Sequence, residues 1–450
     1  MNAERPQRFP MNQSNLLEKA ERYIAGAALG MMHLPRGINP VMVRGRGSRL
    51  WDADGKEYID YLLGSGPMIL GHAHPAVVEA VQRQVALGST YFALNEPIIE
   101  LAEKLVDAVP CGRKAHGDDA AVRFQTSGSE ATFGAMRLAR AFTGRSKILK
   151  FEGGWHGNSD EGQLSAAPTE TPDFPRPVAD SAGIPPSSHQ SMLVSQFNDL
   201  ELTTRIAEEH ARDIAAIIVE PLQRSQKPVP GFLRGLRDLA TKIGAVLIYD
   251  EIVTGFRLAW GGAQEKYGGV PDLATYGKAI AGGYPLSAIV GRRDILSCAD
   301  ASIRREGPPV FLSGTLTGNP IAATAGLATL NELQKPGTLE RLHQMGERYK
   351  EGVEAVGRRY GQPIRVEGDS GVRIVFFERR FEDLDRPMLN HRDTLRCDKA
   401  RMVWFGHEQI RNGIYITPGF KTYISTAHTE DDLACTFAIM EKILEKQHRG

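Results

Sequence analysis

The chain has 450 residues, and its 54 basic and 54 acidic side chains give a formal net charge of zero. A balanced charge does not favour a polyanionic partner and no apolar run reaches the length of a membrane span, so we expect neither nucleic-acid nor membrane binding. The four cysteines stand far apart without a Cys-x-x-Cys pair, which predicts no disulfide framework and favours a cytoplasmic location.

The first elements along the chain are a predicted antiparallel unit and two helices. Residues 41–61 contain the turn dipeptide Asp54-Gly55, which is typical of a hairpin. One helix is predicted to begin at Pro75 and to stop at Gly88, and a second begins at Pro97. The first helix is expected to bury a face formed by Val77, Val78, Val81 and Val85.

Strands then alternate with helices. A strand over 121–124 leads through the loop 126–130 into a helix that closes at Gly144 and is expected to bury Phe142. The runs 147–151, 214–219 and 245–249 are continuously apolar, as expected for strands that are covered on both faces. This alternation predicts an α/β fold with a mostly parallel sheet.

The rest of the chain suggests how the domains are divided. Residues 158–190 are rich in small residues and proline and are expected to form a long active-site loop, whereas the C-terminal part mixes helices with strands near 364–366 and 371–377. We expect residues 71–325 to form a large domain and residues 326–450 to form a smaller α+β domain, to which residues 1–70 contribute.

Lys278 and Asp250 have the most specific chemistry. Lys278 lies in the glycine-rich segment 273–283, where small neighbours favour loss of water, a lowered pKa and a free amine that attacks carbonyls. Asp250 directly follows the apolar run 245–249, and a carboxylate at a strand end can face a cationic ring nitrogen. Alone the pair is a weak signal, because most lysines in glycine-rich loops are solvated.

Two loops add groups that complement this pair. Ser127, Gly128 and Ser129 lie between a strand and a helix N-terminus, where free N–H groups and the helix dipole favour a phosphate. An ordinary serine N-cap is the alternative. Trp155 and His156 follow another strand, and Trp155 either lies against an aromatic ligand or packs in the core.

Glu220 and Thr315 complete the candidate set. Glu220 ends a buried strand, so it shares with Asp250 the carboxyl edge of a parallel sheet, where open α/β folds bind ligands; structural ion pairs are the alternative. Thr315 lies in a hydroxyl-rich loop before a helix and is either a second phosphate donor or part of a turn. His72 and His74 lack a carboxylate constellation at ligand spacing, so we expect no metal site.

An amine, an acid at a strand end, an aromatic side chain and a phosphate loop together predict pyridoxal 5'-phosphate as the cofactor. The motifs at 127–131, 155–157, 219–221, 250–257, 271–278 and 313–320 occur in the order that is typical of class III aminotransferases. The chain resembles that family from about residue 36 to its C-terminus, and is most similar to the glutamate-1-semialdehyde aminomutase subgroup. The resemblance implies the fold type I of pyridoxal-phosphate-dependent transferases, in which a large domain with a mostly parallel, mixed seven-stranded sheet adjoins a smaller α+β domain.

The resemblance also implies roles for single residues. Lys278 would form the Schiff base and shuttle protons, and Asp250 would pair with the pyridine nitrogen. Thr315 would reach the phosphate of the neighbouring subunit, since such enzymes are homodimers with shared active sites. The other positions implied to contact the cofactor are Ser127, Gly128, Ser129, Trp155, His156, Glu220 and Val253.

Two substrate-facing segments differ from the aminomutase subgroup. Ser65 is followed directly by Gly66, where the aminomutases have an intervening tryptophan, and Lys421 stands near an expected acidic position. We therefore predict an aminotransferase that moves an amino group between a small amine or a β- or ω-amino acid and a keto acid. Intramolecular transfer of the glutamate-1-semialdehyde 2,1-aminomutase type is the alternative, and a decarboxylase, a racemase or a cofactor-binding regulator remain open. Arg36, Arg257 and Lys421 are candidates to bind the substrate, although either arginine equally fits a structural ion pair.

Overall fold

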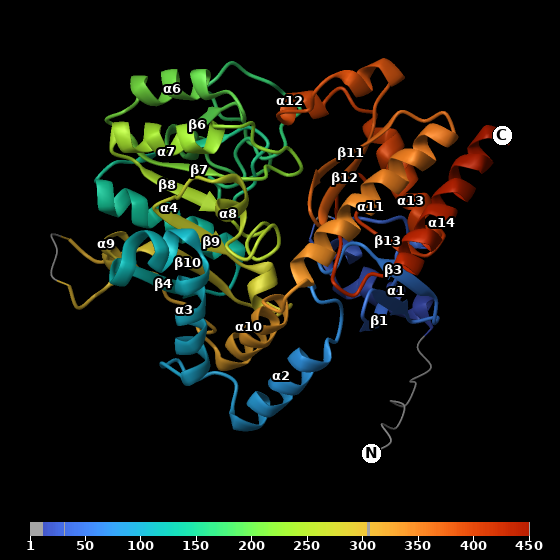
Figure 1. Ribbon diagram of the computed structural model, residues 1–450, viewed down its shortest axis with the longest axis horizontal. Coiled ribbons are helices and arrows are strands. Elements are labelled where there is room, and N and C mark those ends of the chain that lie inside the picture. Colours follow the sequence, from blue (N-terminus) through green and yellow to red (C-terminus); the bar gives the residue numbers. More distant parts are fainter. Residues whose placement is uncertain (1–11, 31, 304–306, 450) are drawn as a thin grey trace.

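The computed structural model describes residues 12–30, 32–303 and 307–449, and its elements form two groups that lie side by side (Figure 1). The teal, green and yellow elements include one large sheet and helices that pack on it. The blue N-terminal strands lie beside the orange and red C-terminal elements, so both ends of the chain contribute to the second group. Residues 1–11 of the expected N-terminal segment lie outside the described residues, and the domain limits after residues 70 and 325 stay a prediction.

The large sheet confirms the expected mixed, mostly parallel arrangement of seven strands. Its strand order is β4-β10-β9-β8-β7-β5-β6. β10 is antiparallel to β4 and β9, whereas the pairs from β9 to β6 are parallel. The strands are β4 (Ala120–Gln125), β5 (Lys147–Phe151), β6 (Met192–Ser195), β7 (Ile214–Val219), β8 (Val246–Asp250), β9 (Leu273–Tyr276) and β10 (Ser287–Arg292).

Helices cover both faces of this sheet, which explains why every residue of β7 is buried. Ile217 belongs to the same core cluster as Leu236 of α7 (Phe232–Ile243). Its neighbour Ile218 belongs to the cluster that contains Ala135 of α4 (Gly128–Thr143). Successive strand residues point to opposite faces, so a strand that is covered on both sides is apolar throughout.

The predicted helix boundaries are confirmed where capping residues marked them. α2 (Pro75–Leu87) begins with proline and ends at Gly88, and α4 ends at Gly144 in a left-handed conformation. The expectation that Val85 and Phe142 are buried is wrong, because these residues are 55% and 37% exposed. Helical periodicity identifies an apolar face but does not show whether the same chain covers it.

The second group contains two small sheets. The order β1-β2-β3-β13 joins β1 (Met42–Arg46), β2 (Arg49–Asp52) and β3 (Glu57–Asp60) to β13 (Ile414–Tyr415), which is parallel to β3. The order β11-β12-β14 joins β11 (Ile364–Asp369), β12 (Val372–Phe377) and β14 (Lys421–Tyr423), all antiparallel. The parallel pairing of β3 with β13 therefore ties the N-terminal hairpin to the C-terminal part of the chain.

The remaining helices connect and cover these sheets. They are α1 (Gln13–Tyr23), α3 (Glu96–Ala108), α5 (Pro186–Gln190), α6 (Leu200–Glu209), α8 (Ala263–Tyr267), α9 (Arg293–Leu296), α10 (Pro320–Leu333), α11 (Thr338–Arg359), α12 (His391–Thr394), α13 (Lys399–Arg411) and α14 (Glu430–Arg449). Within the described residues, no helix is both long and apolar enough to cross a membrane. The cytoplasmic location stays a prediction.

Candidate active site

Four neighbouring strands bring the candidate residues to one edge of the large sheet. β9, β8, β7 and β5 are adjacent and parallel, so their carboxyl ends meet. Lys278 follows β9, Asp250 ends β8, Glu220 follows β7 and Trp155 follows β5. Residues that are distant in the sequence thus lie where parallel α/β sheets bind their ligands.

Asp250 is a buried carboxylate that is held by three donors. Its Oδ2 atom lies 2.9 Å from Nδ1 of His156, and its Oδ1 atom accepts from the Ile252 amide at 3.2 Å and from the Thr275 hydroxyl at 3.4 Å. His156 is only 1% exposed, and its Nε2 atom has no hydrogen-bond partner in the described part of the chain. A buried carboxylate of this kind is costly unless a cation pairs with it, and a protonated ring nitrogen is such a cation.

The Lys278 amine lies near enough to Asp250 for their charges to interact. Its backbone has a φ of +45°, and Gly277 precedes it. Burial, reinforced by the nearby ammonium of Lys421, lowers the pKa of Lys278 to about 8, while Asp250 opposes the shift. The lowered pKa favours the free, nucleophilic amine more than in an exposed lysine.

Glu220 orders the loop that carries Trp155. Its Oε1 atom accepts from the Trp155 amide at 2.7 Å, and its carboxylate lies 3.6 Å from Nζ of Lys421 and 3.9 Å from Nε of Arg224. Burial alone would raise the pKa of Glu220, but Lys421 and Arg224 hold it at about 2. Trp155 is 36% exposed, so its side chain is not part of the closed core.

The N-terminus of α4 packs closely against the loop after β5. A Cβ atom on Gly157 would lie 2.6 Å from Cα of Ser129, and one on Gly128 would lie 3.1 Å from a side-chain carbon of Ile252. The Ser129 hydroxyl accepts from the Asn158 amide at 3.1 Å. Gly128 and Ser129 are the first two helical residues, whose amides have no acceptor within the helix, so a phosphate fits there.

The Ser127 side chain serves the helix itself. Its hydroxyl accepts from the Glu130 amide at 3.3 Å, and the Glu130 carboxylate accepts from the Ser127 amide at 2.8 Å, which is a complete capping box. The Ser127 hydroxyl therefore acts as the N-cap of α4, which is the alternative that the sequence left open. A role of Ser127 in phosphate binding stays a prediction.

The other candidates are placed less directly. Val253 packs beside the small cluster that contains Leu258 and Tyr423. Thr315 is exposed, five residues before α10 begins. His72 lies 2.6 Å from Asp60, and no group of three or more potential ligands for a metal ion occurs among the described residues.

The two candidate arginines have different surroundings. Arg257 is fully buried and donates to the carbonyl groups of Gly66 and Ile424, so it joins two loops rather than forming a structural ion pair. Burial lowers the pKa of Arg257 to about 10. Arg36 pairs with Glu18 and Glu21, each at 3.5 Å, and all three side chains are largely exposed. These contacts hold Arg36 against α1, and its substrate role stays a prediction.

Sequence analysis missed Arg224. Its backbone has a φ of +57°, and its guanidinium donates to the carbonyl groups of Gly153 at 2.9 Å and Ala166 at 3.0 Å. It thereby holds the loop after β5 against the segment after β7. The available signal was its position four residues after Glu220, in the same loop at the carboxyl edge of the sheet.

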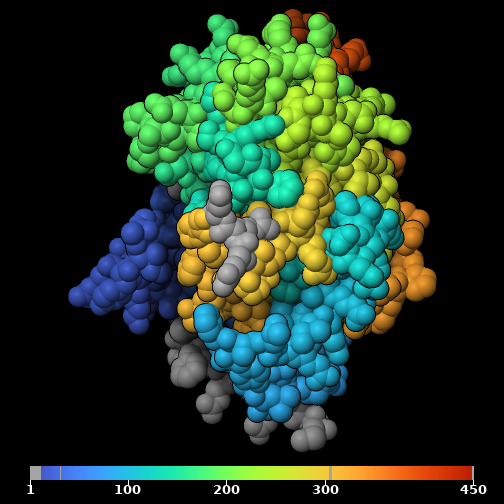
Figure 2. Space-filling model, turned by 90° about the vertical axis from the view of Figure 1, so that its left-hand side faces the viewer, coloured from blue at the N-terminus to red at the C-terminus, as the bar shows by residue number. Residues whose placement is uncertain are grey.

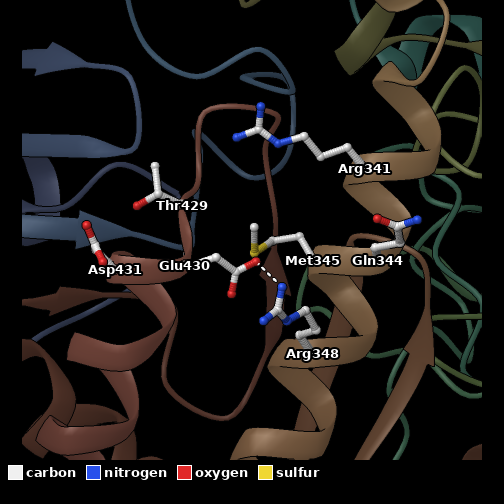
Figure 3. A pocket seen from close by; sticks show the side chains of 7 residues that line it. All are labelled: Arg341, Gln344, Met345, Arg348, Thr429, Glu430 and Asp431. Atoms are coloured by element: carbon white, nitrogen blue, oxygen red, sulfur yellow. Dashed lines mark hydrogen bonds and ion pairs between the residues drawn. The ribbon is translucent and has the colours of Figure 1, made fainter.

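Two cavities differ in their relation to this site. One of about 260 Å³ is lined by Arg224 and Lys421, both of which pair with Glu220. The other, of about 330 Å³, lies between α11 and the start of α14, where Arg348 pairs with Glu430 (Figure 3). Its lining contains none of the candidate residues, so of these two cavities the smaller one adjoins the site described above.

The fold type I architecture and the groups at this edge of the sheet define a pyridoxal-phosphate-dependent enzyme. Residues 34–383 match the family described as aminotransferase class-III. The glutamate-1-semialdehyde 2,1-aminomutase of Desulforamulus reducens is 39% identical over 429 residues, which are 94% of each chain. The chain belongs to the class-III aminotransferase family.

Solved structures agree with this assignment. An ω-transaminase from Sphaerobacter thermophilus superposes with a TM-score of 0.88 at 32% identity, covering 97% of this chain and 98% of its own. The FumI protein of Sphingopyxis sp. MTA144, described as the PLP internal aldimine form, has a TM-score of 0.80 at 28% identity, covering 97% and 96%. Pyridoxal 5'-phosphate is the cofactor of this family, and the buried Asp250, the Lys278 amine and the glycine-lined helix terminus fit it.

Proposed function

We propose that the enzyme transfers an amino group from a small amine or a β- or ω-amino acid to a keto acid, with Lys278 as the catalytic amine. The observation that carries this proposal is the placement of Lys278 beside Asp250 at the edge of the sheet, with a pKa of about 8. Bound pyridoxal phosphate supplies an electron sink for the negative charge that develops at the substrate carbon.

In this proposal each side chain has one task. Lys278 would hold the cofactor aldehyde, and its amine, once the substrate amine has replaced it there, would take a proton from the substrate carbon. Asp250 keeps the ring nitrogen protonated, and His156 fixes the orientation of the Asp250 carboxylate through the 2.9 Å contact. Trp155 and Val253 would contact the ring, and the amides of Gly128 and Ser129 would bind the phosphate.

We also propose that the enzyme is a homodimer with shared active sites. Large apolar side chains are exposed on and after α2 and in the segment before α10, namely Leu87 (74%), Phe92 (73%), Leu94 (85%) and Phe311 (77%). Figure 2 shows the blue and cyan α2 and α3 segments on the same face as the orange segment that precedes α10. An apolar surface of this kind marks a protein interface. Thr315 is exposed four residues after Phe311 in the same segment, which suits a residue that serves the phosphate site of a second subunit.

A glutamate-1-semialdehyde aminomutase reaction is the second candidate. The sequence identity of 38–39% to proteins named glutamate-1-semialdehyde 2,1-aminomutase favours this reaction, and by sequence identity it is better supported than the transaminase reaction. The Lys421–Glu220 ion pair favours the transaminase, because Lys421 puts a cation near the position where the resemblance implies an acid. The aminomutase would isomerise its substrate without a separate keto acid.

The two reactions separate in a panel of amino donors that is assayed with pyruvate or 2-oxoglutarate. Appearance of the aminated acceptor supports the transaminase, with a Lys278→Ala variant as the inactive control. Isomerisation of glutamate 1-semialdehyde in the absence of any acceptor supports the aminomutase instead. If neither reaction is detected with protein that has bound its cofactor, both assignments fail.

A further inference from the structure

The cavity of about 260 Å³ lies between the two groups of elements, beside the proposed active site. One wall comes from the loops after β5 and β7 and includes Gly153, Ala166 and Arg224. The opposite wall comes from β12, from α13 and from residues 418–421. Because Lys421 lines the cavity and pairs with Glu220, the cavity opens beside the groups that surround Lys278.

The lining of this cavity is largely apolar. Ile374, Phe376 and Met402 are buried, and Val403 and Phe420 are 40% and 55% exposed. Such walls bind a small apolar group because both surfaces lose contact with water. The volume is close to the lower end of the range that is usual for small-molecule sites, about 300 Å³. It suits a single side chain such as a phenyl group.

The charged groups of the lining all have the same sign. Arg224, Lys399 and Lys421 line the cavity together with His391, and no carboxylate of the described residues does. Arg224 already donates to two backbone carbonyls, and His391 lies 2.7 Å from the Pro168 carbonyl oxygen. These two side chains therefore position the wall.

Lys421 differs from them because its ammonium has capacity for a second partner. It is 8% exposed, and its ion pair with Glu220 spans 3.6 Å, longer than a hydrogen bond. Glu220 does not depend on Lys421 alone, since it also accepts from the Trp155 amide. An ammonium has three donors, so Lys421 can bind a further carboxylate while it stays near Glu220.

We propose that this cavity selects the amino donor, with Lys421 binding the donor's carboxylate and the apolar walls receiving its side chain. The preferred donor is then an amino acid that combines a carboxylate with a bulky apolar group. The assignment rests on the proposed amino transfer, because it assumes that the donor's amine reaches Lys278.

Binding of unreactive carboxylates tests the cavity without turnover. Calorimetry on the holoenzyme compares 3-phenylpropanoate with propanoate. We expect 3-phenylpropanoate to bind at least about tenfold more tightly than propanoate, because its phenyl group is removed from water in the cavity. Val403→Trp, which fills the cavity from an exposed helix position, should remove that advantage and leave propanoate binding as it was. Equal affinities for the two acids in the wild-type enzyme would overturn the apolar part of the proposal.

Variants of the lysines test the carboxylate site. Lys421→Met should weaken both acids at least about tenfold, whereas Lys421→Arg should keep them, which also guards against a folding defect. Lys242→Met removes a Lys–Glu pair on the surface of α7 and should change nothing. If Lys421→Met binds both acids with wild-type affinity, the assignment of the carboxylate site to Lys421 is contradicted. It is contradicted equally if Lys399→Met, and not Lys421→Met, weakens the binding. If 3-phenylpropanoate binds as expected but no donor is transaminated, the proposed function and the selection of an amino donor both fail, and the cavity remains only a binding site for apolar carboxylates.

Discussion

The imidazole of His156 lies 2.9 Å from the carboxylate of Asp250, and both side chains are buried at the carboxyl edge of the sheet. Asp250 ends β8, and His156 belongs to the loop after β5, two strands away in the sheet. Asp250, which is proposed to pair with the ring nitrogen, is thus itself fixed by a side chain of a second loop. This contact links the proposed cofactor site to the loop that carries Trp155.

Asp250→Asn should abolish turnover while the protein keeps much of its cofactor. The amide has nearly the shape of the carboxylate but cannot keep a ring nitrogen protonated, so we expect kcat to fall by at least about 10³-fold. Steady-state rates and the bound pyridoxal phosphate per chain are measured on the same preparation. A near-wild-type kcat would contradict the proposed role of Asp250.

His156→Phe should reduce kcat less severely, by about 10- to 100-fold, because it removes one partner of Asp250 and leaves the carboxylate in place. His156→Asn puts an amide N–H near the position of Nδ1 and should recover part of the loss. The pH dependence of the bound cofactor's absorbance should shift in the Phe variant and not in the Asn variant. Unchanged spectra in both variants would contradict an effect of His156 on the cofactor through Asp250 and would leave it only a role in packing.

Capture of pyridoxal phosphate by the apoenzyme should depend on pH through Lys278. Only the free amine attacks the aldehyde, so the rate should rise as the pH increases through about 8, where the pKa of Lys278 lies, and then level off. Lys421→Met removes a neighbouring positive charge, which raises the pKa of Lys278 and moves the rise to higher pH. Stopped-flow absorbance gives the profile, and a curve in the variant that moves to lower pH would be incompatible with this electrostatic account.

The Glu220–Lys421 pair should behave as a unit in stability measurements. Glu220→Gln leaves a buried ammonium without its acid and should cost about 3 kcal/mol, whereas the double variant with Lys421→Met should cost less. Urea unfolding of the apoenzyme gives the free energies of unfolding. Strictly additive costs would show that the two charges do not interact.

The same pair has a pH dependence of known sign. The pKa of Glu220 is lowered from 4.5 to about 2, so its contribution to stability is present above pH 4.5 and is lost as the pH falls toward 2. Glu220→Gln should be less sensitive to acid over that interval than the wild-type enzyme. An identical acid dependence of the two proteins would mean that the pair does not contribute.

Much of the fold could be predicted because local signals marked it. Pro75 and Gly88 delimit α2, and the Ser127–Glu130 capping box opens α4. The continuously apolar β7 indicated a sheet that is covered on both faces. The candidate residues at strand ends followed from the same pattern, since parallel strands bring their carboxyl ends to one edge.

The partners of single side chains could not be predicted in this way. Arg257 donates to Gly66 and Ile424, which are 191 and 167 residues away in sequence. The cavity beside Lys421 likewise needs walls from segments that no local pattern relates. Helical periodicity also predicts burial for Val85 and Phe142, which are exposed, because an apolar face can be identified from spacing but its cover cannot.

The most direct test identifies the lysine that holds the cofactor. Burial lowers the pKa of three lysines in this region, to about 7 for Lys150 and about 8 for Lys278, and also for Lys421. Borohydride reduction of the holoenzyme followed by peptide mapping marks the linked residue. We predict that the label is on Lys278 and is absent from the other two. A label on Lys150, on Lys421 or on any other lysine would contradict the central assignment.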